Sequence, residues 1–233
     1  SSNFDLNIRS NKKITLIIIH YTGMQSERES LKRLISPKSK VSTHFLINRA
    51  GKIFRLVDEY YIAWHAGKSK WKNYKNLNKN SIGIELVNRG HRFGYQSFTK
   101  IQIKKLVKLC KYLMKKYHIK KNMILGHSDV APLRKIDPGE KFPWKFLSKK
   151  KIGIWHQLHK EKLRKLRKKK ITEVQKRQCL NFIKKIGYFV KKNNKQNKIK
   201  LFKNFQRRFR QELINGILDK ECLIIAEKLS KIS

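Results

Sequence analysis

An uninterrupted apolar segment near the start of the chain constrains the fold more than any other feature. Residues 14–19 read Ile-Thr-Leu-Ile-Ile-Ile, and the segment stops at His20. A short run this rich in β-branched residues favours a strand that is buried on both faces. Strands of that kind occur in sheets whose two faces are covered by helices. The segment therefore predicts an inner strand of an α/β sheet.

The residues that follow alternate between strand-like and helical patterns. Ser26-x-x-Glu29 is a capping box, which predicts a helix that extends to Ile35. Apolar residues at helical spacing predict a longer helix over 100–117, and the prolines of 128–144 predict a long loop. Alternating or β-branched runs predict further strands at residues 44–49, 52–57, 81–87 and 122–126. We therefore expect an α/β domain over residues 1–150, with a mixed central sheet flanked by helices.

The composition changes after residue 149. Residues 151–171 are rich in Lys and Arg and lack an apolar period, which predicts a basic linker. Thr172-x-x-Gln175 is a second capping box. Helical periodicity then returns over 173–186, 199–210 and 219–231. These segments predict a small all-helical C-terminal domain over residues 172–233.

The charge of the chain is strongly positive. Lys and Arg number 58 against 15 Asp and Glu, which gives a net charge of +43. Such a charge attracts nucleic acid, anionic membrane surfaces or acidic wall polymers. An excess of Lys also follows from the codon usage of an AT-rich genome, so the charge does not by itself identify a partner.

Three cysteines, Cys110, Cys179 and Cys222, lie far apart, which argues against a disulfide framework and against a cysteine zinc site. No segment reaches the ~20 apolar residues of a membrane span, and no signal peptide is visible at Ser1. These features favour the cytoplasm, whereas a tail that binds the cell wall would favour the periplasm. The sequence leaves the compartment open.

Two histidines follow predicted strands directly, and a carboxylate lies nearby. His20 ends the first strand, His127 follows the strand at 122–126, and Asp137 lies in the proline-rich loop. Functional residues of α/β folds gather at strand ends. Two His and one carboxylate can bind zinc and leave its fourth coordination position open for water, as in catalytic zinc sites. Taken alone, a histidine at a strand end is more often a structural hydrogen-bonding residue.

Several motifs, in this order along the chain, resemble the AmpD/AmiD family of N-acetylmuramoyl-L-alanine amidases. They are Ile18-Ile19-His20-Tyr21-Thr22, Trp64-His65-Ala66-Gly67, Ser81-Ile82-Gly83-Ile84-Glu85, Gly126-His127-Ser128-Asp129-Val130-Ala131-Pro132 and Arg134-Lys135-Ile136-Asp137-Pro138-Gly139. The resemblance extends from about residue 3 to residue 155. It implies an enzyme that hydrolyses the amide bond between N-acetylmuramic acid and L-alanine in peptidoglycan or muropeptides.

The resemblance also implies roles for individual residues. One zinc ion per chain is expected, with His20, His127 and Asp137 as its ligands. Glu85 matches the general base of the family, and Lys135 matches a cationic residue beside the metal.

Four further residues are candidates for binding the substrate. Trp64 and His65 lie in a stretch that resembles the wall of the family's substrate groove. Asn88 and Arg134 could hold carboxylates of the stem peptide, Arg134 through a bidentate contact. A structural role for each of the four is an open alternative.

The helical tail resembles the peptidoglycan-binding domain of AmiD-type amidases in its Gly187-Tyr188 turn, its Phe205-Gln206-Arg207-Arg208-Phe209 segment and its Asn215-Gly216 turn. We expect a monomer that binds peptidoglycan or muropeptide. Two alternatives are a catalytically silent muropeptide-binding protein and a nucleic-acid-binding protein that uses the basic helical tail. The tail contains interleaved aromatic residues but no recognised nucleic-acid motif.

Overall fold

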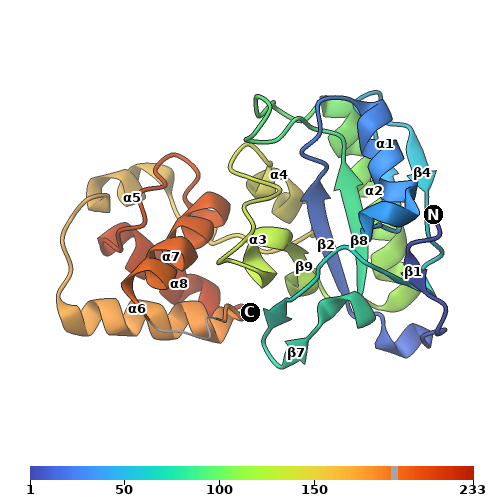
Figure 1. Cartoon of the computed structure of the whole chain (residues 1–233). Coiled ribbons are helices and arrows are strands. Elements are labelled where there is room, and N and C mark those ends of the chain that lie inside the picture. The colour runs from blue at the N-terminus through green and yellow to red at the C-terminus, as the bar shows by residue number, and fades with distance from the viewer. Residues whose placement is uncertain (190–193) are drawn as a thin grey trace.

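The structure is a computed structural model, and it describes residues 1–189 and 194–233. The central sheet and the helices α1 and α2 form one half of the molecule, and α5 to α8 form the other (Figure 1). The short helices α3 and α4 lie between the two halves (Figure 1). The helices are α1 (Glu27–Ile35), α2 (Lys100–Tyr117), α3 (His127–Val130), α4 (Trp144–Lys149), α5 (Lys160–Leu166), α6 (Glu173–Ile186), α7 (Lys195–Phe209) and α8 (Lys220–Ser230).

The central sheet has five strands in the order β4-β3-β8-β2-β9. Its strands are β2 (Leu16–Tyr21), β3 (Phe45–Ile47), β4 (Ile53–Arg55), β8 (Ser81–Leu86) and β9 (Ile124–Gly126). The pairs β3–β8, β8–β2 and β2–β9 are parallel, and β4 pairs with β3 in antiparallel fashion. The mixed sheet is as predicted. Two small sheets pair β1 (Phe4–Asp5) with β5 (Ile62–Ala63) and β6 (Lys70–Trp71) with β7 (Tyr74–Lys75).

The apolar segment that predicted an inner strand is buried as expected. Leu16 to Ile19 of β2 have no exposed surface. The predicted helix over 100–117 is α2, whose apolar stripe packs into the same large core. On β3, Ile47 joins this core, whereas Leu46 packs against Leu34 of α1. Because successive strand residues point to opposite faces, α1 and α2 cover opposite faces of the sheet.

The segment predicted to be a basic linker is instead packed against both halves. It contains the helix α5, and its apolar residues Ile152, Ile154, Leu163 and Ile171 are buried in the main core. These residues lack a regular period because most of the segment is not a helix, so periodicity alone could not find them.

The helical half is built as the sequence predicts. The Thr172–Gln175 capping box starts α6, and Gly187 ends it with a φ of 139°. Phe205 and Phe209 of α7 are buried, and Phe202 packs partly against the core. The rings of Phe205 and Phe209 are therefore unavailable for stacking on nucleic-acid bases. Within the described residues, no helix is both long and apolar enough to cross a membrane.

Candidate active site

The parallel strands bring polar side chains to one edge of the sheet. His20 and Glu85 are direct neighbours in the register of β2 and β8. His127 begins α3, immediately after β9, the strand on the other side of β2. Asp137 returns to the same place because its carbonyl oxygen accepts a hydrogen bond of 2.9 Å from Ser128 N, in α3. The carboxyl edge of the sheet therefore gathers residues that lie far apart in the sequence.

His20, His127 and Asp137 form a compact set of metal-binding atoms. His20 Nδ1 lies 2.9 Å from His127 Nδ1, and Asp137 Oδ2 lies 3.2 Å and 3.1 Å from these two atoms. Ligands of tetrahedral zinc at about 2.0–2.1 Å from the ion are separated by about 3.3 Å. All three residues are buried and their ligand atoms converge. The set therefore fits a zinc ion.

Hydrogen bonds determine which nitrogen of His127 faces this centre. His127 Nε2 lies 3.2 Å from the carbonyl oxygen of Ala66. Arg134 Nη2, which can only donate, lies farther from the same nitrogen, at 3.4 Å. The carbonyl is the shorter contact and can only accept, so Nε2 carries the hydrogen. With a metal ion bound, Nδ1 would then present a lone pair rather than a hydrogen on the side of Asp137 Oδ2. That lone pair points at the centre, as a neutral imidazole ligand requires.

A second chain of hydrogen bonds fixes His20 through His65. Ser81 Oγ donates to the carbonyl oxygen of Leu77 at 2.6 Å, so it accepts from His65 Nε2 at 3.2 Å. Burial lowers the pKa of His65 well below 6.5, so this ring is neutral. His65 Nδ1 must then accept from His20 Nε2, at 3.0 Å. His20 Nδ1 is thereby left with its lone pair directed at the centre.

The glycine of the Ser81-Ile82-Gly83-Ile84-Glu85 motif makes room for this arrangement. A Cβ atom on Gly83 would lie 2.5 Å from Cγ of His65. Ser81, Gly83 and Glu85 alternate along β8 and so share one face of the sheet. The motif thus provides a partner for His65, space for its ring, and a carboxylate beside the centre.

Glu85 has the burial and the raised pKa of a proton-transferring group. Its Oε2 is buried, and nowhere in the described chain does this atom find a hydrogen-bond partner. Burial raises the pKa of Glu85 to about 8; the charge of Asp137 adds to the increase and that of Lys135 opposes it. A carboxyl group that titrates near neutral pH can both accept and return a proton.

A cavity of about 440 Å³ opens over these residues. Its walls include the three candidate metal ligands, Glu85, Lys135, Trp64 and the backbone around Gly23. Four cationic side chains and two carboxylates line it, namely Arg33, Arg92, Arg134, Lys135, Glu85 and Asp137. The excess of positive charge suits an anionic ligand.

The four residues predicted to bind the substrate occupy different positions. Trp64 lines the cavity, and its Nε1 donates to Asp5 at 3.0 Å. Arg134 also lines the cavity, but its guanidinium donates to the carbonyl oxygens of Ala66 and Lys68. His65 lies beneath His20, and both of its ring nitrogens are occupied by the hydrogen bonds given above. His65 therefore supports a candidate ligand; it also lines the cavity, and its contact with the substrate stays a prediction.

Asn88 is not one of the residues that line the cavity, and its role in binding the substrate stays a prediction. The residue is 1% exposed. Its Nδ2 donates to the carbonyl oxygen of Gln96 at 2.9 Å, and its Oδ1 accepts from the backbone N–H groups of Gly90 and Gln96. These hydrogen bonds of the side chain shape the loop over residues 88–96.

Several residues that complete the site could not be singled out from the sequence. Ser81 was recognised only as part of a motif, and Arg33 and Arg92 were hidden among many other cationic residues. Their position on the cavity wall depends on how α1 and the loop after β8 pack. An Arg in an amphipathic helix ordinarily faces solvent, so no sequence signal distinguishes Arg33.

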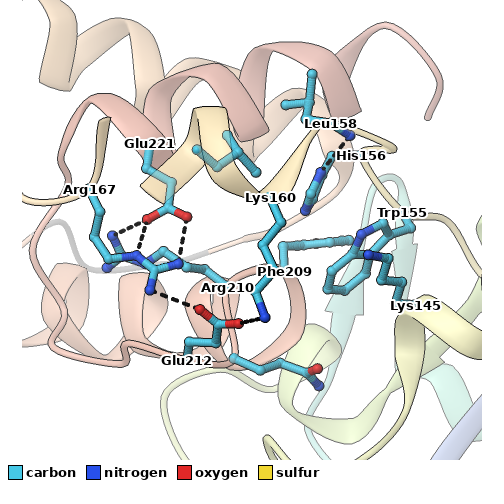
Figure 2. A pocket seen from close by; sticks show the side chains of 12 residues that line it. Lys145, Trp155, His156, Leu158, Lys160, Arg167, Phe209, Arg210, Glu212 and Glu221 are labelled. Atoms are coloured by element: carbon cyan, nitrogen blue, oxygen red, sulfur yellow. Dashed lines mark hydrogen bonds and ion pairs between the residues drawn. The ribbon is translucent and has the colours of Figure 1, made fainter. Parts of the chain in front are cut away.

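A smaller cavity of about 150 Å³ lies in the helical half, lined by residues of α5, α7 and α8 and by Trp155 (Figure 2). Figure 2 shows that most of its charged side chains bind one another. Glu221 accepts from Arg167 at 2.7 Å, and Glu212 accepts from Arg167 at 3.0 Å and pairs with Lys160. Both carboxylates of this cavity are therefore bound by cations, whereas Lys145 is joined to no other side chain in Figure 2. Among the described residues, the lining of this cavity contains no set of metal-binding side chains like that at the sheet edge.

The fold and the site together define a class of protein. Two His and one carboxylate, with an additional proton-transferring carboxyl beside an open cavity, are typical of metal-dependent hydrolases.

Comparison with known proteins gives the family. Residues 10–140 match the family described as N-acetylmuramoyl-L-alanine amidase. The chain is 35% identical to the N-acetylmuramoyl-L-alanine amidase AmiD of Escherichia coli, over 93% of this chain and 82% of AmiD. It is 36% identical to the 1,6-anhydro-N-acetylmuramyl-L-alanine amidase AmpD of Haemophilus influenzae, over 56% of this chain and 79% of AmpD. The chain therefore belongs to the N-acetylmuramoyl-L-alanine amidase family.

A solved structure extends the similarity to both halves of the molecule. The complex of E. coli AmiD with the substrate anhydro-N-acetylmuramic acid-L-Ala-D-γ-Glu-L-Lys matches 98% of this chain and 93% of its own chain. The two structures share 33% sequence identity and a TM-score of 0.83. The mixed sheet and the helical C-terminal region are thus both features of the AmiD fold.

Proposed function

We propose that this amidase binds one zinc ion through His20, His127 and Asp137 and hydrolyses the amide bond between the muramoyl lactyl group and L-alanine of a muropeptide. The convergence of three buried ligand atoms beside Glu85 supports this proposal most directly. When bound, zinc would supply Lewis-acid chemistry, because it polarises a carbonyl group and acidifies a water molecule.

The protein's own side chains supply the remaining steps. Glu85 accepts a proton from the attacking water and passes it to the nitrogen of the leaving L-alanine. Its raised pKa, about 8, suits it to both transfers near neutral pH. Attack places negative charge on the carbonyl oxygen, and the ammonium of Lys135, which lines the same cavity, stabilises that charge.

The charge of the cavity supports an anionic muropeptide as the substrate. A stem peptide carries carboxylates, and Arg33 and Arg92 are available on the cavity wall to bind them. We propose that residues 1–150 form the catalytic domain. We also propose that residues 172–233 bind the intact cell wall. The AmiD relative has been solved with an anhydro-muropeptide, and we propose the same class of substrate here.

Product analysis by mass spectrometry tests the function. Anhydro-muropeptide and intact sacculi are offered separately to the zinc-loaded protein, and we expect release of free stem peptide from the former. A protein that binds muropeptide but releases no peptide, with zinc present, would be a silent binding protein and would contradict the proposal.

A further inference from the structure

Asn204 connects the helical half to a loop of the active site. It lies inside α7, is 1% exposed, and its Nδ2 donates to two backbone carbonyl oxygens. The acceptors are Pro132 O at 2.7 Å and Lys135 O at 3.0 Å. One amide group thus holds both ends of the turn that contains Arg134 and Lys135. In Figure 1, α7 faces α3 and the loop that follows it.

The orientation of this amide is determined by its other partner. Asn204 Oδ1 faces the guanidinium of Arg207, which also contacts Glu140 through Nε at 3.1 Å. A guanidinium can only donate, so the oxygen must face Arg207 and the NH₂ group must face the two carbonyls. The contact is therefore specific to an amide: a carboxylate at this position would place oxygen against oxygen.

The turn held by Asn204 and the candidate metal ligand Asp137 are held by different elements. Asp137 is held by α3, through Ser128 N at 2.9 Å. The carbonyl of Lys135 is held by α7. Removal of the Asn204 side chain should therefore disturb Lys135 and leave Asp137 in place.

We propose that Asn204 is a positioning residue for the hydrolysis, and that it acts by holding Lys135 at the cavity. The helical half would then form part of the active site, in addition to any role in binding the wall. This inference rests on the proposed function, because it takes Lys135 as the group that stabilises charge on the substrate. Misplacing a reacting group by about 1 Å can cost up to 10²-fold in rate.

A double-mutant cycle tests the inference. The zinc-loaded wild type, Asn204→Ala, Lys135→Ala and the double variant are compared by the steady-state rate of peptide release over a range of anhydro-muropeptide concentrations. We expect Asn204→Ala to lower kcat about 10-fold or more with a smaller change in KM. In the Lys135→Ala background the same substitution should have little further effect, since residues that act through one another are not additive.

Zinc affinity, measured by competition with a chelator, provides a readout independent of turnover, and it should stay unchanged in Asn204→Ala. Lys203→Ala, an exposed neighbour on α7, is the matched control and should retain wild-type kcat. If Asn204→Ala fails to fold, the isosteric Asn204→Asp replaces it, with the same expected loss of kcat and the same dependence on Lys135.

The possible outcomes separate the two proposals. A wild type that releases no peptide refutes the proposed function. If the wild type is active, two results would refute the positioning role. The first is that the losses from Asn204→Ala and Lys135→Ala are additive, and the second is that Asn204→Ala lowers zinc affinity together with kcat. Either result would leave Asn204 as a residue of general stability.

Discussion

The sheet and the helical half reach the active site by different means. The sheet positions His20 and Glu85 through main-chain pairing, because the register of β2 and β8 makes them neighbours. The helical half acts through side chains: Arg208 binds Asp129 in a buried ion pair, and Tyr188 donates to the same carboxylate at 2.5 Å. Main-chain geometry tolerates most substitutions, whereas a buried side-chain contact depends on a single residue.

Asp129 is one of the residues at which the two halves meet. Its carboxylate accepts from the backbone N–H of Gly126 at 2.6 Å, next to His127. Arg208 also donates to the carbonyl oxygen of Ile124 at 3.1 Å and lies 4.1 Å from the ring of Trp144. Contacts from α7 therefore reach the end of β9 and the start of α3. In this family member the helical half is part of the scaffold of the site.

The largest effect is expected at the edge of the sheet. His127→Ala removes one of three candidate ligands and should abolish both zinc binding and turnover. Glu85→Gln keeps every ligand, so it should retain zinc and lose about 10²- to 10⁴-fold in kcat, as expected for a general base. Zinc content by metal analysis and peptide release by mass spectrometry measure the two quantities. Full activity in either variant would contradict the assigned roles.

The contact between the halves should have the next largest effect. Arg208→Met leaves Asp129 buried without its cation, which typically costs about 3–5 kcal/mol of unfolding free energy. Arg177→Met, on the exposed face of α6, is the control and should change stability by less than about 0.5 kcal/mol. Denaturant unfolding measures both. Equal stability of the two variants would mean that the halves are joined mainly by apolar contacts.

The sequence predicts the residues that strand register positions better than those that depend on contacts between distant side chains. His20, Glu85 and His127 follow or occupy strands that their own patterns reveal, so their convergence could be expected. Asn204 could not be predicted, because its partners are backbone carbonyls of a loop distant in the sequence. The hydrogen bonds of Asn88 could not be predicted either, because the shape of its loop is not evident from the sequence. Only the unfavourable helix propensity of Asn inside α7 marked position 204.

A smaller effect on zinc affinity is expected from Ser81→Ala. This variant tests whether strand register alone orients His20 at the edge of the sheet. Without Ser81 Oγ, His65 Nε2 loses the acceptor that fixes the His65–His20 hydrogen bond. Loss of such an outer partner typically weakens metal binding about 10- to 100-fold. Chelator competition measures the zinc affinity. Ser148→Ala, whose hydroxyl bonds only within its own helix, is the control. Unchanged affinity in Ser81→Ala would show that strand register by itself directs His20.

The smallest effect is expected from Glu140, which contacts α7 near the surface. Burial alone would raise the pKa of Glu140, but hydrogen bonding to His91 and the charges of His91 and Arg207 outweigh it and lower the pKa to about 2. A lowered folded-state pKa means that the ionised group adds stability above its ordinary value of 4.5, and that this stability is lost as the pH falls towards 2. Glu140→Gln should therefore cost less than about 1 kcal/mol at pH 7. The difference from wild type should shrink by pH 3, which denaturant unfolding at the two pH values measures. If Glu140→Gln lowered the unfolding free energy at pH 7 as much as Arg208→Met does, this order of effects would be wrong. The contacts that join the halves would then lie at the surface and not at Asp129.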